Sequence, residues 1–238
     1  MNTTTIKAVF FDLDGTLLPM DQSVFLKEYL KRLAIFVAPH GVAPDKMVEA
    51  TMAATEYMIH NDGSKYNKEV FWENFFRLIG AERNDLVAIT DEFYLGKFKE
   101  VRDHVGTNPL ARDIVRAAGQ KGRKVVLATN PVFPMAAQLE RISWIRLEES
   151  DFEFITSYDN SKFCKPNPDY YREICEKVGV APEECLMIGN DERDDMKAAS
   201  ESGMRCFLIT DCRIMSDHFV WTGERGSFEQ ALHMLERL

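Results

Sequence analysis

Two aspartates separated by one residue, Asp12 and Asp14, stand at the end of an apolar run of the chain. The run, residues 7–11, is typical of a buried strand that ends in turn residues. In open α/β sheets ligands bind just beyond the carboxyl ends of the strands, so we expect both carboxylates to face a pocket. Gly15 permits a sharp turn straight after Asp14, which lets both carboxylates approach one reacting atom. This spacing favours a nucleophile paired with an acid/base group, although Asp and Gly are also common in ordinary turns.

Other polar residues follow later apolar runs or lie close to them: Thr129, Asn130, Lys165, Asn190, Asp191, Asp194 and Asp195. Taken singly, Lys165 is typical of a solvated surface lysine and Thr129 of a hydroxyl at a strand end. Together with the two aspartates the set indicates phosphoryl transfer, because a carboxylate attacks phosphorus well only when the negative charges are offset. Lys165 supplies one positive charge, and a divalent metal ion is expected to supply the other.

The same residues include suitable ligands for the metal and for phosphate. Mg²⁺ binds a few carboxylates together with waters and substrate oxygens, and the expected protein ligands are Asp12, the backbone carbonyl of Asp14 and Asp191. The Thr129 hydroxyl and the backbone amides near Asn130 are expected to bind the phosphate oxygens, as in other electrostatic clamps. We therefore predict Mg²⁺ as the cofactor and a small phosphate ester as the substrate.

The elements that position these residues alternate between strands and helices along the second half of the chain. After the first strand, further strands are expected at residues 124–129, 152–156, 185–189 and 205–210. Helices are expected at residues 110–120, 134–142, 168–178, 196–202 and 227–237. This alternation predicts an α/β fold with a Rossmann-like, doubly wound parallel sheet.

Helical spacing prevails between the first strand and this alternating part. Helices are expected near residues 26–37, 45–58, 70–79 and 85–98, with a polar loop at residues 60–67. We therefore predict two domains, a Rossmann-like catalytic core of residues 1–18 and 106–238 and an inserted all-helical domain of residues 19–105. An aromatic group on one face of the third helix is expected to pack this domain rather than to bind a ligand: Phe71, Trp72, Phe75 and Phe76.

The composition excludes several classes of protein. A chain of 238 residues, 45% of them hydrophobic, can bury a full core. The net charge of −9 argues against a nucleic-acid-binding surface, for which a basic patch is expected. The five cysteines are scattered and lack zinc-site spacing, so we expect reduced thiols and a cytoplasmic protein. The sequence shows no secretion signal and no membrane-spanning run, so no membrane partner is expected.

Four motifs in order resemble those of the haloacid dehalogenase superfamily, specifically its Mg²⁺-dependent phosphatase branch. They read DLDGT at residues 12–16, ATN at residues 128–130, KPNP at residues 165–168 and IGNDERDD at residues 188–195. The resemblance spans residues 6–212, and the four ordered motifs are specific together although each is weak alone. It implies that the helical insertion is a mobile cap that covers the active site, excludes water and selects the leaving group.

The resemblance also implies a role for each matching residue. Asp12 becomes the aspartyl-phosphate, and Asp14 protonates the leaving oxygen and then activates water. Thr129 binds the phosphoryl group, Lys165 stabilises the charge on nucleophile and phosphoryl group, and the acidic motif holds the metal. Dehalogenating members of the superfamily lack the second aspartate, so Asp14 implies a phosphatase or a phosphomutase.

The acidic motif departs from the usual pattern of this superfamily, which reads Gly-Asp with a further Asp beyond. This chain reads Gly189-Asn190-Asp191, with Asp195 following. Either Asn190 or Asp191 therefore takes the position that faces the metal, and we favour Asp191 because a carboxylate suits Mg²⁺ better than an amide. Asp195 is expected to orient the metal waters or Lys165 from outside.

The sequence predicts hydrolysis of a small soluble phosphomonoester through an aspartyl-phosphate. A phosphomutase of the same fold is an alternative. A phospho-acceptor regulatory protein is a second alternative, because such proteins also combine an Asp acceptor with Thr and Lys around Mg²⁺. Asp14 argues against this alternative, since this residue is placed to hydrolyse an acyl-phosphate. The sequence leaves the identity of the ester and the oligomeric state open.

Overall fold

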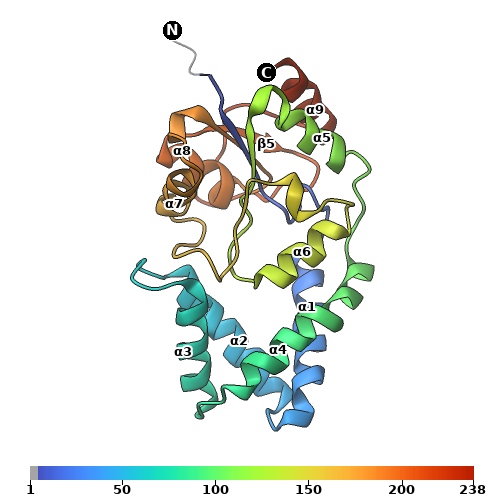
Figure 1. The fold of residues 1–238 in the computed structure, drawn as a ribbon, viewed down its shortest axis with the longest axis vertical. Helices are drawn as coiled ribbons and strands as arrows, with labels where there is room; N and C mark the ends of the chain where they lie inside the picture. Colours follow the sequence, from blue (N-terminus) through green and yellow to red (C-terminus); the bar gives the residue numbers. More distant parts are fainter. Residues whose placement is uncertain (1–4) are drawn as a thin grey trace.

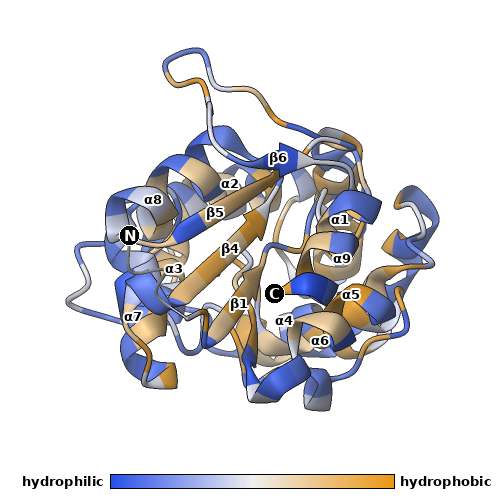
Figure 2. Ribbon diagram, turned by 90° about the horizontal axis from the view of Figure 1, so that it is seen from above, coloured by the Kyte–Doolittle hydropathy of each residue, from blue (hydrophilic) through white to orange (hydrophobic). Residues whose placement is uncertain are grey.

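The computed structural model describes residues 5–238, whose strands form one six-stranded parallel sheet (Figures 1 and 2). The strands are β1 (Ala8–Phe11), β2 (Lys124–Leu127), β3 (Phe154–Ile155), β4 (Cys185–Gly189), β5 (Arg205–Ile209) and β6 (Arg225–Gly226). Their order across the sheet is β3-β2-β1-β4-β5-β6, so β1 pairs with β2 on one side and with β4 on the other. The strand order reverses beside β1, where doubly wound sheets form a crevice at the carboxyl ends of the strands. The structure confirms the predicted fold class.

Both faces of the sheet are covered, because successive residues of a strand point to opposite faces. The covering helices are α5 (Ala111–Ala118), α6 (Met135–Ser143), α7 (Pro168–Val178), α8 (Ala198–Ser202) and α9 (Phe228–Arg237). On β1, Val9 and Phe11 belong to a core that includes residues of α5, α6 and α9. Ala8 and Phe10 belong to a second core, formed with α7 and α8. All four side chains are buried, so β1 is covered on both faces, as its apolar run predicts.

Four α-helices follow β1 before α5 begins: α1 (Gln22–Val37), α2 (Pro44–Ile59), α3 (Asn67–Ile79) and α4 (Asp85–Gly96). They lie together below the sheet in Figure 1, beyond the carboxyl end of β1. α1 packs against α2 and α4, and α2 packs against α3. Two segments connect these helices to the sheet, one near Pro19 and one near Gly106. The Gly106 amide donates a 2.7 Å hydrogen bond to the Pro19 carbonyl, so the two connecting segments lie side by side.

The observed elements differ from the predicted ones in some of their bounds and by one additional strand. The helix expected at residues 196–202 begins earlier, with a π-helical turn at Glu192–Lys197 that precedes α8. The short strand β6 was not predicted, because its two residues carry no apolar run. The helix expected at residues 85–98 ends at Gly96, and a 3-10 helix follows at Phe98–His104. Among residues 5–238, no helix has the length and apolar character needed to span a membrane.

Candidate active site

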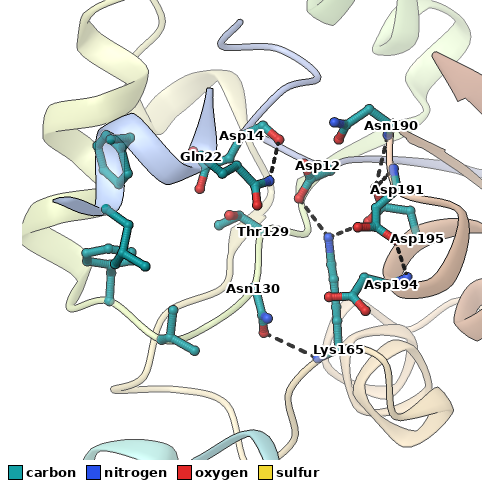
Figure 3. Close-up of a pocket in the computed structure, with 14 residues that line it drawn as sticks. Asp12, Asp14, Gln22, Thr129, Asn130, Lys165, Asn190, Asp191, Asp194 and Asp195 are labelled. Atoms are coloured by element: carbon teal, nitrogen blue, oxygen red, sulfur yellow. Dashed lines mark hydrogen bonds and ion pairs between the residues drawn. The ribbon is translucent and has the colours of Figure 1, made fainter. Parts of the chain in front are cut away.

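A cavity of about 190 Å³ opens at the carboxyl ends of β1, β2 and β4. All eight candidate residues line it: Asp12, Asp14, Thr129, Asn130, Lys165, Asn190, Asp191 and Asp195. Figure 3 shows their side chains converging from separate segments of the sheet edge. Six further residues complete the lining: Gln22, Phe25, Leu26, Val132, Phe133 and Asp194. The fold therefore brings together residues that are up to 183 positions apart in the sequence, from Asp12 to Asp195.

Lys165 lies between two carboxylates at the centre of the site. Its Nζ atom is 2.7 Å from Asp12 Oδ1 and 2.6 Å from Asp195 Oδ1 (Figure 3). The Lys165 side chain is only 2% exposed, so it is not the solvated surface lysine that the residue alone would suggest. Burial by itself would lower the pKa of Lys165, but the charges of Asp12 and Asp195 outweigh it and hold this pKa well above its ordinary value. Lys165 is thus a fixed positive charge beside the candidate nucleophile.

The charge on Asp12 is not fully offset by this lysine. Burial raises the pKa of the Asp12 carboxyl to about 8, although Lys165 opposes the shift, and the nearby charges of Asp195 and Asp14 raise it further. The Thr16 hydroxyl donates a long hydrogen bond of 3.4 Å to Asp12 Oδ2. An additional positive charge in the cavity would therefore favour the ionised form of Asp12, which is the nucleophilic form.

Asp195 is held rigidly in its position. Its Oδ2 atom accepts hydrogen bonds of 3.0 Å from the backbone amides of both Asn190 and Asp191, while Oδ1 faces Lys165. Gly189 makes this arrangement possible, because a Cβ atom at that position would clash with the Asp195 side chain. Asp195 therefore fixes both Lys165 and the backbone that follows β4.

Asn190 and Asp191 differ in how their side chains are used. The Asn190 side chain donates 2.6 Å to the Cys212 carbonyl and accepts 3.0 Å from the Thr16 hydroxyl, so both of its ends bind protein. Asp191 caps the π-helical turn, because its Oδ1 atom accepts 2.8 Å hydrogen bonds from the amides of Arg193 and Asp194. These bonds use one carboxylate oxygen of Asp191, and the other accepts no hydrogen bond from residues 5–238.

Asp14 lies in a tight turn that starts the connection to α1. Gly15 adopts a positive φ of 87°, and a Cβ atom there would clash with the Asn190 side chain, so the turn packs directly on the β4 loop. The Asp14 Oδ2 atom is 2.5 Å from Arg141 Nη1 of α6, and its backbone carbonyl accepts 3.3 Å from Gln22 Nε2 of α1. Asp14 Oδ1 is buried without a hydrogen-bond partner among residues 5–238.

Sequence reasoning missed Arg141 and Gln22. The Arg141 side chain is completely buried, its guanidinium lies 4.6 Å from the centre of the Phe133 ring, and it also contacts Gln138. Gln138 in turn donates 3.1 Å to the Thr156 carbonyl, which links Asp14 through α6 to the end of β3. No local motif marks Arg141, because a single arginine on an amphipathic helix is typical of a solvated face.

Thr129 and Asn130 form the wall opposite the acidic loop. Thr129 lines the cavity and is only 1% exposed. Its backbone carbonyl accepts hydrogen bonds from the hydroxyls of Tyr170, at 2.8 Å, and Thr156, at 2.7 Å. Asn130 Oδ1 accepts 3.3 Å from the Lys165 amide. The end of β2 is thereby fixed relative to Lys165.

Among residues 5–238, no group of three or more His, Cys, Asp or Glu side chains is arranged to hold a metal ion. A site that combines two carboxylates with a backbone carbonyl, waters and substrate oxygens is still compatible with this arrangement, since Mg²⁺ usually keeps several waters.

The chain is similar to known phosphatases over most of its length. A model of the haloacid dehalogenase-like hydrolase family matches residues 6–203. A glyceraldehyde 3-phosphate phosphatase of Methanothermobacter thermautotrophicus is 29% identical over 207 residues, which cover 86% of this chain and 85% of the relative. A phosphoglycolate phosphatase of Shigella boydii is 32% identical over 213 residues, which cover 83% of this chain and 79% of the relative.

Solved structures share the fold. A 2-haloacid dehalogenase from Pseudomonas syringae superposes with a TM-score of 0.63 at 19% sequence identity. The match covers 98% of this chain and 99% of the other. The match spans both the sheet and the helical segment. At 19% identity it concerns the fold alone.

Proposed function

Because the chain belongs to the family of haloacid dehalogenase-like hydrolases and acts on phosphate monoesters, we propose that it hydrolyses a small soluble phosphomonoester through an aspartyl-phosphate on Asp12. The family membership confirms the resemblance that the four motifs predicted. The observation that carries the proposal is the buried contact of Lys165 with both Asp12 and Asp195 at the base of the cavity. A lysine in this position can offset the charge that accumulates when a carboxylate approaches phosphorus.

The proposed reaction has two steps. In the first, an oxygen of the Asp12 carboxylate forms a bond to phosphorus, the bond from phosphorus to the ester oxygen breaks, and Asp14 gives its proton to the leaving alkoxide. In the second, the Asp14 carboxylate takes a proton from a water molecule as that water bonds to phosphorus. The bond to Asp12 then breaks, which releases inorganic phosphate and restores both carboxyl groups to their starting states.

Lys165, Thr129 and Asn130 are proposed to hold the phosphoryl group in line with Asp12. Lys165 is positioned by Asp195 and supplies positive charge beside the reacting oxygens. The Thr129 hydroxyl and the backbone amides near Asn130 lie on the opposite wall and can donate to phosphate oxygens. Charge and donors on both sides would keep the phosphoryl group in the geometry that attack requires.

The donor set fits Mg²⁺. The residues that would hold the ion are Asp12, Asp191 and, through its backbone carbonyl, Asp14. Burial raises the pKa of Asp12 in spite of Lys165, so a further positive charge would favour its ionised form. One carboxylate oxygen of Asp191 is not used by the π-helical turn. Asn190 is the weaker candidate, because both ends of its side chain bind protein. When bound, the ion would neutralise charge between the nucleophile and the phosphate.

Residues 19–105 are proposed to form a separate cap domain on a core of residues 1–18 and 106–238. The hydrogen bond from Gly106 to Pro19 joins the two connections, so a hinge at this point would move both together. Gln22 and Leu26 of α1 already line the catalytic cavity. Closure of such a cap would exclude water from the first step.

The first experiment measures phosphate release from p-nitrophenyl phosphate with Mg²⁺ and with EDTA. We expect release with Mg²⁺, loss of release with EDTA, and loss in the Asp12→Asn variant, whose amide has nearly the same shape but is a poor nucleophile. Asp113→Asn, an exposed position on α5, is the matched control and should retain activity. Appreciable activity of a folded Asp12→Asn protein would reject Asp12 as the nucleophile.

The same assay separates the alternatives. A phosphomutase would convert sugar phosphates without net release of phosphate, and a phospho-acceptor regulator would keep its acyl-phosphate. The ion pair of Asp14 with Arg141 places a second carboxylate beside Asp12, an arrangement that favours breakdown of the intermediate over storage.

A further inference from the structure

A second cavity, of about 310 Å³, continues from the catalytic cavity into the helical segment. The two cavities share Gln22, Leu26, Asn130, Val132 and Phe133 as lining residues. The second cavity extends between α1, α2, α3 and α4. A phosphate held at Asp12 would therefore direct the organic part of its ester past Val132 and Phe133 into this space.

The walls of the second cavity are aromatic and aliphatic. Tyr29, Trp72, Tyr94 and Tyr158 are among its lining residues, and the hydroxyls of Tyr29 and Tyr94 bind each other at 2.6 Å. Among residues 5–238, no Lys, Arg or His side chain lines this cavity, and its single charged side chain is Glu56. A leaving group with a carboxylate or a second phosphate would find no positive charge there, and burial of an unpaired charge is strongly unfavourable.

The Thr51 hydroxyl, which belongs to a lining residue of this cavity, lacks a partner. Thr51 is only 4% exposed, and its hydroxyl makes no hydrogen bond among residues 5–238. An unsatisfied buried group is unfavourable, so a ligand oxygen that accepts from it would be stabilised.

We propose that the second cavity binds the leaving group of the substrate, and that this group is an uncharged, ring-sized, largely apolar alcohol with a hydrogen-bond acceptor that faces Thr51. This assignment rests on the proposed phosphatase function. It adds to that function a substrate class, which follows from the missing positive charge and from the unpartnered Thr51 hydroxyl.

The first test compares two esters of nearly equal shape, 4-acetylbenzyl phosphate and 4-carboxybenzyl phosphate, by phosphate release with Mg²⁺. The uncharged ester should have a kcat/KM at least about 10-fold higher, because the carboxylate would be buried without a counter-charge. Phosphate release at equal efficiency, or a preference for the carboxylate, would overturn this assignment and leave the phosphatase function intact. Absence of release from both esters and from p-nitrophenyl phosphate would overturn both.

The second test removes the hydroxyl of Thr51. Thr51→Val should lower kcat/KM for 4-acetylbenzyl phosphate about 10-fold and leave that for benzyl phosphate, which lacks the acceptor, unchanged. Thr210→Val, at an exposed position directly after β5 that lines neither cavity, is the control and should leave kcat/KM for both esters unchanged. Equal losses for both esters, or no loss in Thr51→Val, would overturn the role of Thr51.

Discussion

At the residue scale, the chemistry depends on how one lysine serves two carboxylates. Lys165 contacts Asp12 and Asp195 at nearly equal distances, and Asp195 is in turn fixed by two backbone amides. Asp12 can give up its contact with Lys165 when it bonds to the phosphoryl group. Asp195 is restrained by its two hydrogen bonds from backbone amides. The lysine is thus positioned by one carboxylate and available to the other.

The pH dependence of stability follows from the burial of Asp12. In the metal-free protein, burial raises the pKa of Asp12 from 3.8 to about 8, so the folded state keeps a proton that the unfolded chain releases between these values. The free energy of unfolding should therefore fall as pH rises through this window, by up to about 1 kcal/mol per pH unit near neutrality. Urea denaturation in EDTA at about pH 6 and about pH 8 measures this slope. The Asp12→Asn variant should show a shallower slope, and equal slopes would contradict the assignment.

Arg141 is expected to position Asp14. Replacement by Met keeps much of the packing on Phe133 but removes the ion pair to Asp14, so kcat should fall about 100-fold with little change in KM. Steady-state kinetics across pH, with urea denaturation to establish folding, would test this. Gln138→Leu, which removes a neighbour of Arg141 and not Arg141 itself, should have a smaller effect in the same direction. An unchanged kcat and pH profile in folded Arg141→Met would show that the ion pair is only structural.

At the scale of elements, the π-helical turn after β4 determines how the side chains of Asn190 and Asp191 are used. The wider turn begins at Glu192 and is capped by the Asp191 side chain, while the Asn190 side chain bonds to Thr16 and Cys212. Asp191→Asn should keep the cap but raise the Mg²⁺ concentration needed for half-maximal activity about 10-fold or more. Asn190→Ala should lower the free energy of unfolding by about 1–3 kcal/mol and leave the Mg²⁺ requirement unchanged. The reverse pattern would assign the metal position to Asn190.

The sheet and the strand-end residues could be predicted because they depend on local patterns. Asp12 and Lys165 each belong to a short motif, and the apolar run of β1 marks a buried strand. Arg141 could not be predicted, because its contact with Asp14 joins positions 127 residues apart and no local signal encodes it. The π-helical turn was missed for a related reason, since its charged residues carry no apolar period.

The prediction for the aromatic residues of α3 was incomplete. Phe71, Trp72, Phe75 and Phe76 do pack on one another, as their spacing predicts. Phe71 and Trp72 also line the second cavity. Helical periodicity gives the buried face, but it does not distinguish a filled core from the wall of a cavity. The polar loop at residues 60–67 lines neither the catalytic cavity nor the second cavity.

At the scale of the whole molecule, Asn67 connects the helical segment to the sheet. Its side chain is fully buried and donates to the carbonyls of Pro131 and Phe163, both at 3.4 Å, and to the Cys164 sulfur at 3.3 Å. Asn61 donates 2.8 Å to its carbonyl oxygen. Pro131, which follows Asn130, and Cys164, which precedes Lys165, are therefore both bonded to the start of α3.

Loss of this connection should weaken both stability and substrate binding. Asn67→Ala should lower the free energy of unfolding by about 2 kcal/mol, because several buried polar groups lose their partner. KM should also rise, because the start of α3 loses its hydrogen bonds to the residues next to Asn130 and Lys165. Asn74→Ala, which removes a bond within α3 to the Val70 carbonyl, is the control for both readouts. Equal effects of the two substitutions would contradict a role for Asn67 between the segments.

The most direct test of the central claim is to find the phosphoryl group on Asp12. The Asp14→Asn variant should break down the intermediate about 100-fold or more slowly, so it is mixed with substrate and Mg²⁺, quenched in acid and digested for mass spectrometry. We predict that the peptide with Asp12 gains the mass of one phosphoryl group, and that the gain disappears when Asp12→Asn is added. Phosphate release without a phosphorylated Asp12, or with the group on another residue, would contradict the proposed mechanism.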